Sequence, residues 1–409
     1  MHRHVPILIF AAAMGLLPAS AALPQEVAQT QPQTPGEPST APGWRFTPSI
    51  GYGQVYDDNV LMQGKESAPP GDLLSLITPK AELDFNGRRG HLTADYSGGF
   101  EFDRQFNSLD NFRQFESVSA RRLMTSHTTL YVQQQFAMTP TTELPALAGI
   151  PFARVGSRVL GLRAGIEHYF TKHTEVSAFY NFQDIAFNKD PVTGLVLLGG
   201  QGNGGSVAVR HEMSAMIALL LDYNLQVASV INSGISTINN LLAGGEYKFS
   251  ATTSVSAEGG IARLSPNALT PAYTGPAWQA GLTHRMGRTN VDLTYTRGYV
   301  PSFGNGQTID SDDVGAHFRT PLARRVYTQG SVDWRRDIPL KGTTVTLPGE
   351  QNIRTLLFSG LVGYSANQWL RIEGYFSTSR QTINRPGGEV DVNRVGIQVG
   401  MSTKPKRLF

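Results

Sequence analysis

Residues 91–103, with the sequence HLTADYSGGFEFD, alternate between two kinds of side chain along their whole length. One set of alternate positions is apolar or small and comprises Leu92, Ala94, Tyr96, Gly98, Phe100 and Phe102. The positions between them are mostly polar or acidic and include Thr93, Asp95, Ser97, Glu101 and Asp103. Because successive side chains of a β-strand point to opposite faces, this period of two predicts a strand with one apolar and one polar face.

The same alternation recurs from Trp44 onward in stretches of about ten residues, the length of a strand that crosses a membrane. It is clear at 129–138, 290–296 and 370–379, and spacing alone places further strands near 112–122 and 353–364. Short polar turns are expected near 86–90, 125–128, 171–174, 213–215, 250–253, 287–290, 321–325 and 365–368. Longer loops are expected near 57–71, 104–110, 139–157, 188–203, 229–237, 264–275, 301–312, 337–350 and 382–390.

Eight short turns and nine long loops connect about eighteen strands and leave both termini at the short-turn end. Bacterial outer-membrane barrels have an even strand count, short periplasmic turns and longer external loops. The fold class predicted is therefore all-β: a transmembrane antiparallel up-and-down β-barrel. A soluble propeller or sandwich would also give many short strands, but neither requires loop lengths to alternate, and no blade repeat is present.

The composition of the 409-residue chain excludes several classes of protein. Only 16% of its residues are charged, and it contains no cysteine, so a disulfide framework and a thiol nucleophile are both impossible. The formal net charge is +3, and no run of Lys or Arg is long enough to indicate nucleic-acid binding.

The N-terminal region predicts export. Residues 1–22 combine a short charged start, an apolar stretch and small residues before a cleavage point at Ala21 or Ala22, which is the pattern of a signal peptide. Residues 23–43 are rich in Pro, Gln and Thr and are expected to form a flexible linker. The barrel is expected over residues 44–409, in the outer membrane of a Gram-negative bacterium, with the outer-membrane lipid as one partner.

A short motif follows the aromatic first strand: Tyr56, Asp57, Asp58 and Asn59, with Val60 after them. This segment, together with the chain length and the Gly-rich hairpins of residues 44–403, resembles the β-barrel porin family found in exopolysaccharide gene clusters. The resemblance implies an outer-membrane channel that exports an extracellular polysaccharide, working with periplasmic export partners. Two alternatives stay open: a general or substrate-specific diffusion porin for small solutes, and an outer-membrane hydrolase built on a barrel.

The polar face of the strands predicts the lining of an aqueous lumen. Candidate lining residues carry both signs of charge: Glu82, Asp95, Glu101, Arg163, Glu167, Asp222, Glu246, Asp292, Asp333, Arg335, Arg371 and Glu373. They could pair with one another and keep the lumen wet, or they could form a selectivity filter or sugar track. Tyr131, Phe179, Tyr327 and Tyr375 have the same phase and could stack on sugar rings.

Charge and apolarity are unevenly distributed along the predicted axis. Basic residues gather near the periplasmic turns, and the candidate basic mouth comprises Arg88, Arg89, Arg121, Arg122, Arg324 and Arg325. Such a mouth would attract anions over long range.

Two external loops are unusually apolar, at 144–152 and 195–198. They could fold into the lumen as a constriction, pack on each other, or pair as a small sheet above the rim.

Searches for catalytic and ligand-binding motifs identify no candidate catalytic, cofactor-binding or metal-binding residues. The zincin, nucleophile-elbow and phosphate-loop motifs are all missing from the sequence. Residues 310–313, with the sequence DSDD, carry oxygen ligands but lack the calcium-loop spacing, and a solvated acidic loop is the favoured interpretation. The sequence thus predicts a non-enzymatic channel without a cofactor.

Overall fold

The computed structural model describes residues 42–144, 147–188, 197–231, 234–266, 271–304, 306–340, 352–384, 388–403 and 406–407. The predicted signal peptide, 1–22, lies outside these residues, as does all but the last two residues of the predicted linker, 23–43. The first strand begins at Gly43, one residue before the expected start of the barrel.

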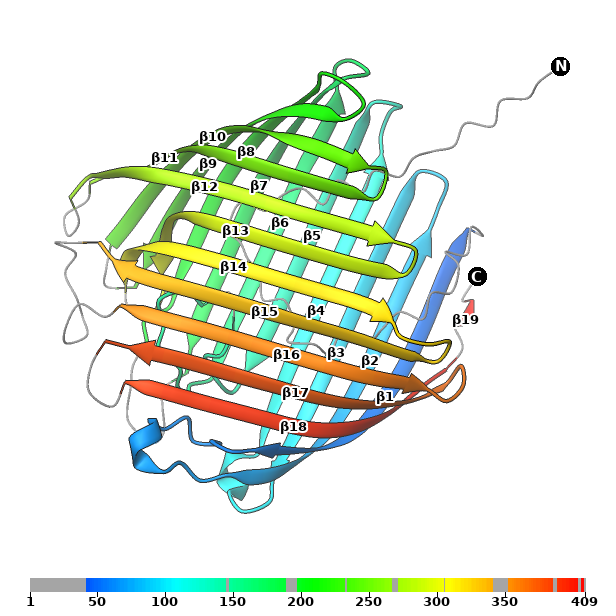
Figure 1. Cartoon of the computed structure of the whole chain (residues 1–409), viewed down its shortest axis with the longest axis vertical. Helices are drawn as coiled ribbons and strands as arrows, with labels where there is room; N and C mark the ends of the chain where they lie inside the picture. The colour runs from blue at the N-terminus through cyan, green and yellow to red at the C-terminus, as the bar shows by residue number, and fades with distance from the viewer. Residues whose placement is uncertain are drawn as a thin grey trace.

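Nearly every described residue belongs to a long β-strand (Figure 1). The strands are β1 (Gly43–Asp57), β2 (Asp72–Asn86), β3 (Gly90–Asp103), β4 (Asn111–Leu123), β5 (Thr128–Thr139), β6 (Ser157–Tyr169), β7 (Thr174–Phe187), β8 (Gly200–Glu212), β9 (Ile217–Val230), β10 (Gly234–Ser250), β11 (Thr253–Leu264), β12 (Tyr273–Met286), β13 (Thr289–Ser302), β14 (Gln307–Pro321), β15 (Val326–Pro339), β16 (Ile353–Ser365), β17 (Leu370–Ile383), β18 (Glu389–Ser402) and the two-residue β19 (Lys406–Arg407). Two single-turn 3-10 helices, η2 (Lys65–Ser67) and η3 (Asn107–Leu109), lie in connections. No helix in the described part of the chain is long and apolar enough to span a membrane.

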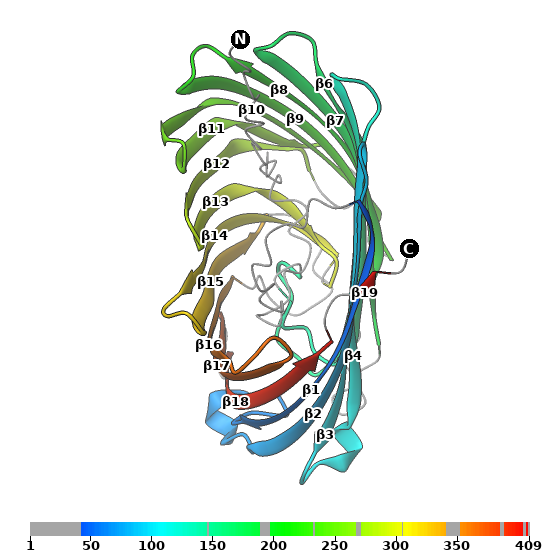
Figure 2. The same cartoon turned by 90° about the vertical axis from the view of Figure 1, so that its right-hand side faces the viewer.

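Strands β1 to β18 close into a single antiparallel barrel. Each strand pairs with the next along the chain, and β18 returns to pair with β1 from Ser49↔Ser402 to Asp57↔Arg394. Strand β19 adds a short pairing to the start of β1. The strands are tilted relative to the barrel axis, the short turns gather at the end where β1 begins and β18 ends, and the cross-section is elongated (Figures 1 and 2). The eighteen-stranded barrel expected from the alternation is confirmed.

The outer face of the barrel is apolar. On β18, the alternate residues Val395, Ile397, Val399 and Met401 are all exposed, and on β1 the exposed set includes Ile50, Tyr52 and Tyr56. Such a continuous apolar belt is unstable in water, and a closed barrel is the only arrangement in which strands cross lipid with every backbone group paired. The chain is therefore an outer-membrane β-barrel, with the short-turn end periplasmic and the opposite end external.

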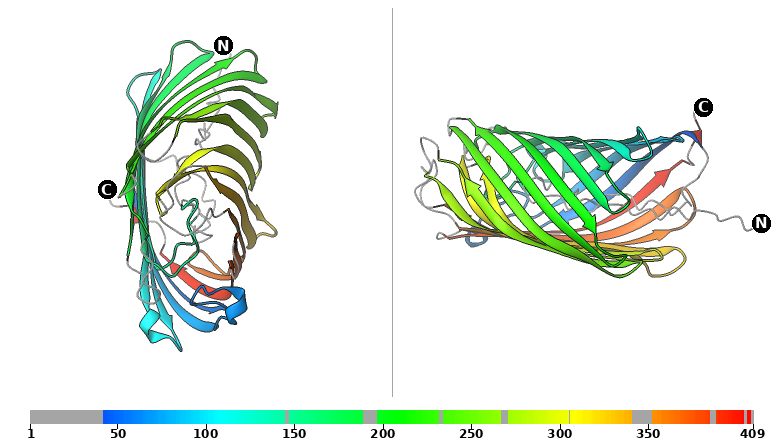
Figure 3. Two further views of the ribbon diagram at one scale, coloured as in Figure 1. Left: turned by 90° about the vertical axis from the view of Figure 1, so that its left-hand side faces the viewer. Right: turned by 90° about the horizontal axis from the view of Figure 1, so that it is seen from above.

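Packing inside the barrel is concentrated in its external half. The largest cluster of buried apolar side chains joins the β6, β7 and β9 walls to connections between strands, and it comprises Leu144, Leu147, Ile150, Val155, Val159, Ile185, Leu197, Ala228, Val230 and Phe303. The periplasmic half has no comparable cluster among the described residues. Inserted segments are visible within the ring in end view (Figure 3).

Two of the expected long loops are mostly strand. Strands β9 and β10 run to Val230 and from Gly234, and β13 and β14 run to Ser302 and from Gln307, so the predicted loops 229–237 and 301–312 shrink to short turns. Residues 310–313 therefore lie within β14, and the interpretation of this segment as a solvated acidic loop is wrong. The physical reason is pairing: Asp310 and Asp312 contact Arg297 on β13, and Asp313 contacts Arg335 on β15.

Candidate functional site: the interior of the barrel

The connection between β5 and β6, of which the structure describes residues 140–144 and 147–156, enters the barrel and reaches the opposite wall. The Gly149 N–H donates to Asp337 Oδ2 of β15 at 2.7 Å. The Phe152 N–H donates to Gln381 Oε1 of β17 at 2.6 Å, and Gln381 Nε2 donates back to the Ile150 carbonyl at 2.9 Å. Asp337 and Gln381 belong to the inward-facing set of their strands, since each is buried and flanked by outward residues. The loop is thus held in place by hydrogen bonds from the lumen wall.

Local geometry at Gly149 explains how the loop passes so close to the wall. Its φ is +68°, a conformation that side-chain-bearing residues rarely adopt. A Cβ at this position would lie 2.9 Å from Ser302 Oγ and 3.0 Å from Ile309 Cδ1. Glycine is therefore required both by the backbone conformation and by the close contact with the β13–β14 hairpin.

The tip of the β13–β14 hairpin enters the same space from another side. Phe303 is only 4% exposed and packs over β8, where Cβ atoms at Gly200 and Gly202 would lie 3.0 and 3.5 Å from its ring. The Leu198 N–H donates to the Gly304 carbonyl at 3.0 Å. Parts of both apolar loops thus pack on each other inside the barrel, because Leu144, Leu147, Ile150 and Val155 share one buried cluster with Leu197, and Leu198 packs against it. Residues 145, 146, 195 and 196 of the two predicted apolar segments lie outside the described residues.

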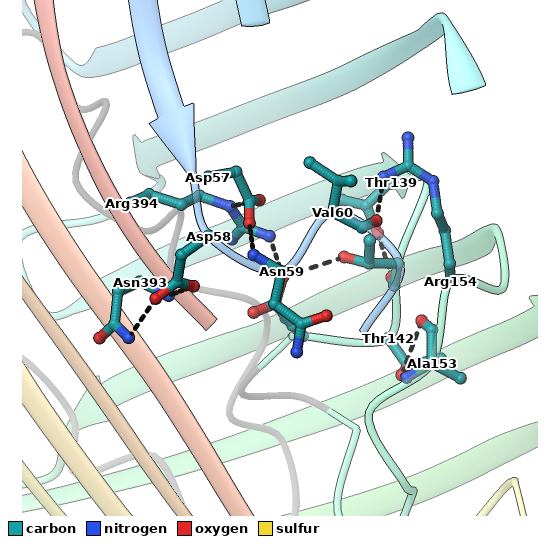
Figure 4. Close-up of polar contacts among 12 residues, drawn as sticks. Asp57, Asp58, Asn59, Val60, Thr139, Thr142, Ala153, Arg154, Asn393 and Arg394 are labelled. Atoms are coloured by element: carbon teal, nitrogen blue, oxygen red, sulfur yellow. Dashed lines mark hydrogen bonds and ion pairs between the residues drawn. The ribbon is translucent and has the colours of Figure 1, made fainter. Parts of the chain in front are cut away.

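The Tyr56–Asn59 motif lies at the seam where the first and last strands meet (Figure 4). Asp58 accepts hydrogen bonds from the Asn393 N–H and Nδ2, both at 2.7 Å. Asn59 Nδ2 donates to the Asp391 carbonyl at 2.8 Å, and its Oδ1 accepts from the Gln63 N–H. The side chains of the motif therefore join β1 to β18 at the external end, while Tyr56 points outward and is exposed.

Arg394 connects this seam to the inserted loop. Its Nε donates to Asp57 Oδ2 at 2.6 Å, and its Nη2 donates to Glu143 Oε2 at 2.8 Å. The two carboxylate side chains are only 4% and 6% exposed. Arg154 makes a second link, donating to the carbonyls of Val60 and Leu109 at 2.6 and 2.9 Å (Figure 4). The loop is thereby anchored at both ends to the β1–β18 side.

The strand register places all twelve candidate lining residues on the face opposite the apolar belt. They are distributed around the circumference rather than along one path: Glu82 on β2, Asp95 and Glu101 on β3, Arg163 and Glu167 on β6, Asp222 on β9, Glu246 on β10, Asp292 on β13, Asp333 and Arg335 on β15, and Arg371 and Glu373 on β17.

Many of these side chains have polar partners of their own. Glu101 lies 3.3 Å from Arg113, Glu246 lies 3.1 Å from Arg210, and Arg335 lies 3.1 Å from Asp313. Arg163 lies over the Phe179 ring at 4.0 Å, and the Tyr327 hydroxyl donates to Glu373. Among the four aromatic candidates, Tyr131 and Phe179 are neighbours, with ring centroids 6.4 Å apart. Tyr327 and Tyr375 lie on β15 and β17 and form no continuous track with that pair.

The six arginines of the candidate basic mouth all lie at the short-turn end. Arg88 and Arg89 occupy the β2–β3 turn, Arg324 and Arg325 occupy the β14–β15 turn, and Arg121 and Arg122 are close to the end of β4. All six are exposed. Four of them lie side by side, because Arg121 and Arg122 pair with His91 and Gly90 next to Arg88 and Arg89. Arg324 and Arg325 lie apart from these on the β14–β15 turn, so the six arginines form two separate basic groups on the rim.

Sequence reasoning missed the residues that hold the inserted loop in place. Arg394, Asp337 and Gln381 are single polar residues within otherwise ordinary alternating strands, so nothing local distinguishes them. The signal that could have indicated their partners is the composition of the loop itself, where the apolar run 144–152 is flanked by Glu143 and Arg154. A charged residue at each end of an apolar loop is expected where the loop is buried and its ends need partners.

Comparison with known proteins identifies similar folds only. No family model matches the chain, and no curated protein matches it. Among solved structures, Pseudomonas aeruginosa OpdO is 11% identical, with 88% of this chain and 97% of that chain covered and a TM-score of 0.44. Acinetobacter baumannii OccAB4 is 8% identical, with 90% and 100% covered and a TM-score of 0.44. Pseudomonas aeruginosa OpdK, solved with vanillate, is 11% identical, with 88% and 99% covered and a TM-score of 0.41.

Identities near 10% and TM-scores below 0.5 leave the function of this chain to be argued from its own residues. The resemblance to porins of exopolysaccharide gene clusters gains no support from these comparisons and stays a prediction.

Proposed function

We propose that the chain is a selective diffusion channel that passes small solutes across the outer membrane. The observation that carries this proposal is the inserted loop, 140–156, whose backbone is hydrogen-bonded to β15 and β17 on the far wall. An eighteen-stranded barrel would otherwise enclose a wide aqueous lumen. A segment fixed across that lumen narrows it, and a narrow passage lined by charges of both signs selects solutes by size and by polar groups.

Export of an extracellular polysaccharide is less well supported. The export function is inferred only from the resemblance to the exopolysaccharide porin family. The periplasmic export partners are inferred from the same resemblance. A loop that Arg394 and Arg154 fix in the external half would block the passage of a polymer. The same loop would let small molecules pass and select them by size. The hydrolase alternative is favoured by no contact among the described residues. The small-solute channel is therefore preferred.

The six arginines at the periplasmic end have a supporting role in this proposal. Six exposed arginines around one mouth raise the local concentration of small anions there, because their fields add over distances comparable to the Debye length. These arginines would bias the conductance toward anions without binding any one solute tightly.

The experiment is a size-exclusion measurement with the refolded barrel in liposomes. Neutral sugars of increasing length are supplied outside, and the swelling rate gives the largest sugar that enters. We expect mono- and disaccharides to enter and longer oligosaccharides to be excluded. Replacing residues 147–152 by Gly and Ser should raise the limit, whereas the same replacement in the exposed turn 213–216 at the opposite end should leave it unchanged.

Two results would overturn the proposal. Entry of long oligosaccharides into wild-type liposomes would favour the polymer channel. Complete exclusion of monosaccharides by a heat-modifiable, correctly folded barrel would show that the loop closes the lumen to every solute.

A further inference from the structure

Two arginines lie side by side on the outside of the barrel, close to its external end. Arg336 of β15 is directly opposite Arg354 of β16 in the antiparallel ladder, so both side chains leave the sheet on the same face. Arg354 is exposed and Arg336 is half-buried. These two residues are called the arginine pair below.

Alternation along β15 shows that the pair is on the face that meets the membrane. Val332 and Trp334 are exposed members of the apolar belt and have the same phase as Arg336. Arg335, one residue earlier, points into the lumen and lies 3.1 Å from Asp313. The arginine pair therefore belongs to the lipid-facing surface of the two adjacent strands (Figure 1).

The apolar belt on β16 ends just before the arginine. From Tyr364 to Leu356 the outward positions carry apolar or aromatic side chains or glycine, and the next outward position is Arg354. A strand rises about 3.3 Å per residue, so this belt is roughly 26 Å long along the tilted strand, comparable with the apolar band of about 25 Å on transmembrane barrels. Arg354 thus lies at the external boundary of the apolar belt, where lipid headgroups begin.

No ion pair to either arginine occurs in the described part of the chain. Asp312 of β14 is directly opposite Arg336, but its carboxylate is engaged with Arg297 of β13 at 3.8 Å. On the other side, Arg354 is opposite the uncharged Thr382 of β17. Like charges directly opposite each other destabilise a sheet, so two neighbouring arginines in this position indicate an anion that the protein does not itself supply.

Other outward arginines near the external end differ from the arginine pair. Arg380 of β17 already donates to Asp391 at 2.7 and 3.0 Å. Arg158 of β6 is exposed, but the residues opposite it are Met138 and Ala186, so it has no second arginine beside it in the ladder. The arginine pair is therefore distinguished by two adjacent guanidinium groups that can act on one ligand.

The chemistry of the pair fits a phosphate monoester. Directly opposite residues have Cβ atoms about 4.5–5.5 Å apart, so two guanidinium groups can converge on one tetrahedral anion. Each guanidinium group presents a planar fork of N–H donors that binds phosphate oxygens in pairs. A phosphate monoester carries about −1.5 to −2 charges at pH 7, which matches two arginines, whereas the phosphodiester of an ordinary phospholipid carries a single charge.

We propose that the arginine pair binds the phosphate monoester of a glycolipid in the outer leaflet of the membrane. The acyl chains of the lipid lie along the apolar belt of β15 and β16, and Trp334 contacts the lipid at the level where aromatic residues of barrels meet headgroups. The site is on the outside of the barrel, so the proposal is independent of the function proposed for the lumen.

The test is native mass spectrometry of the refolded barrel in detergent micelles, which counts the lipids bound to each barrel. The probes are lipid A, which carries phosphate monoesters, lipid A stripped of phosphate, phosphatidylglycerol and inorganic phosphate. We expect one lipid A to bind at least about tenfold more tightly than any other probe. Arg336→Gln and Arg354→Gln should each weaken its binding by at least about fivefold, because each removes charge-assisted hydrogen bonds to phosphate.

Arg158→Gln is the matched control, since it removes an exposed outward arginine of the same kind from another wall. It should change lipid A binding by less than about twofold. Heat modifiability on gels shows that each variant is folded. Single-channel conductance should be the same in the wild type and in both variants of the pair, because neither arginine faces the lumen.

Several outcomes would overturn the proposal. Equal binding of phosphatidylglycerol, or equal weakening by Arg158→Gln, would indicate a general attraction of anionic lipid to the barrel. Inorganic phosphate that binds as tightly as lipid A would assign the pair to a free anion. Absence of lipid A binding would show that the two arginines are only solvated. Conductance separates this proposal from the proposed function, because specific lipid binding to a barrel without conductance would refute the channel and keep the site.

Discussion

Replacing Arg394 with methionine should weaken the barrel more than any other single change at its seam. The guanidinium group joins Asp57 of β1 to Glu143 of the inserted loop through two short hydrogen bonds. Methionine retains the apolar stem and removes both bonds, so two carboxylates that are 4% and 6% exposed lose their common cation. Removing one partner of a buried ion pair is costly because the remaining charge stays away from water.

The magnitude follows from the two contacts. A hydrogen bond to a charged group contributes about 1.5–3 kcal/mol, so the loss of two amounts to about 3–6 kcal/mol. The Arg394 side chain retains 28% of its exposure, and water screens part of each interaction. We therefore expect the free energy of unfolding to fall by the lower part of that range, about 3–4 kcal/mol.

Equilibrium urea unfolding in lipid vesicles, followed by tryptophan fluorescence, measures this change, since the chain has 4 Trp. Glu143→Gln alone should cost less than Arg394→Met, because Asp57 keeps its partner. The double variant Arg394→Met with Glu143→Gln should be less destabilised than the sum of the two single variants. A loss below about 1 kcal/mol for Arg394→Met, or strict additivity in the double variant, would refute the account of Arg394 as the link between seam and loop.

Three further predictions test other parts of the molecule. Phe303→Ala should raise single-channel conductance, because the ring fills space against β8, whereas Phe249→Ala, at a position 60% exposed, should leave conductance unchanged. Gly244→Ala should destabilise the barrel by at least about 3 kcal/mol or prevent folding, since its Cβ would meet the Ala257 carbonyl, while Gly374→Ala, with no atom within 4 Å, should be neutral in the same urea titration. Reversal of Arg88, Arg89, Arg324 and Arg325 to Glu should shift the reversal potential in a salt gradient toward cation preference, and an unchanged potential would exclude a role of these arginines in ion selectivity.

The barrel was predictable because its determinants are local. Alternation over residues 91–103 gives the two faces of β3, and the short turns give antiparallel neighbours with little freedom of register. Even the strands near 112–122 and 353–364, which alternate poorly, were placed correctly by spacing between turns, and the structure has them as β4 and β16.

The positions at which the strands end on the external side were harder to predict, as residues 301–313 show. Gly, Asn and Asp are typical of turns in water, so this segment was expected to be a loop. In the barrel, the same acidic residues have arginine partners on neighbouring strands, which lets β14 continue through them. Those partners are known only once the register is known.

The sequence shows that the inserted loop is unusually apolar, but it does not show where the loop lies in the barrel. Its apolar run indicates that the loop is shielded from water. Three arrangements remain open from the sequence: folding into the lumen, packing on the other apolar loop, or pairing as a small sheet above the rim. The choice depends on Asp337 and Gln381, which lie 188 and 229 residues away in the chain from the atoms they bind. No spacing rule links residues at such separations, because the contact exists only after the barrel has closed.

The Asp57–Asp58–Asn59 motif has a physical explanation that is independent of any family. Seventeen of the neighbouring strand pairs in this barrel are consecutive in the chain, so a connection helps to set their register. The pair β1–β18 has no such connection, and a slip of one residue there would turn every side chain of the seam to the wrong face. Hydrogen bonds from Asn393 to the Asp58 carboxylate and from Asn59 to the Asp391 carbonyl specify one register at the external end. A polar motif just after the first strand is thus what closure of the barrel itself requires, and its presence does not depend on which solute the channel carries.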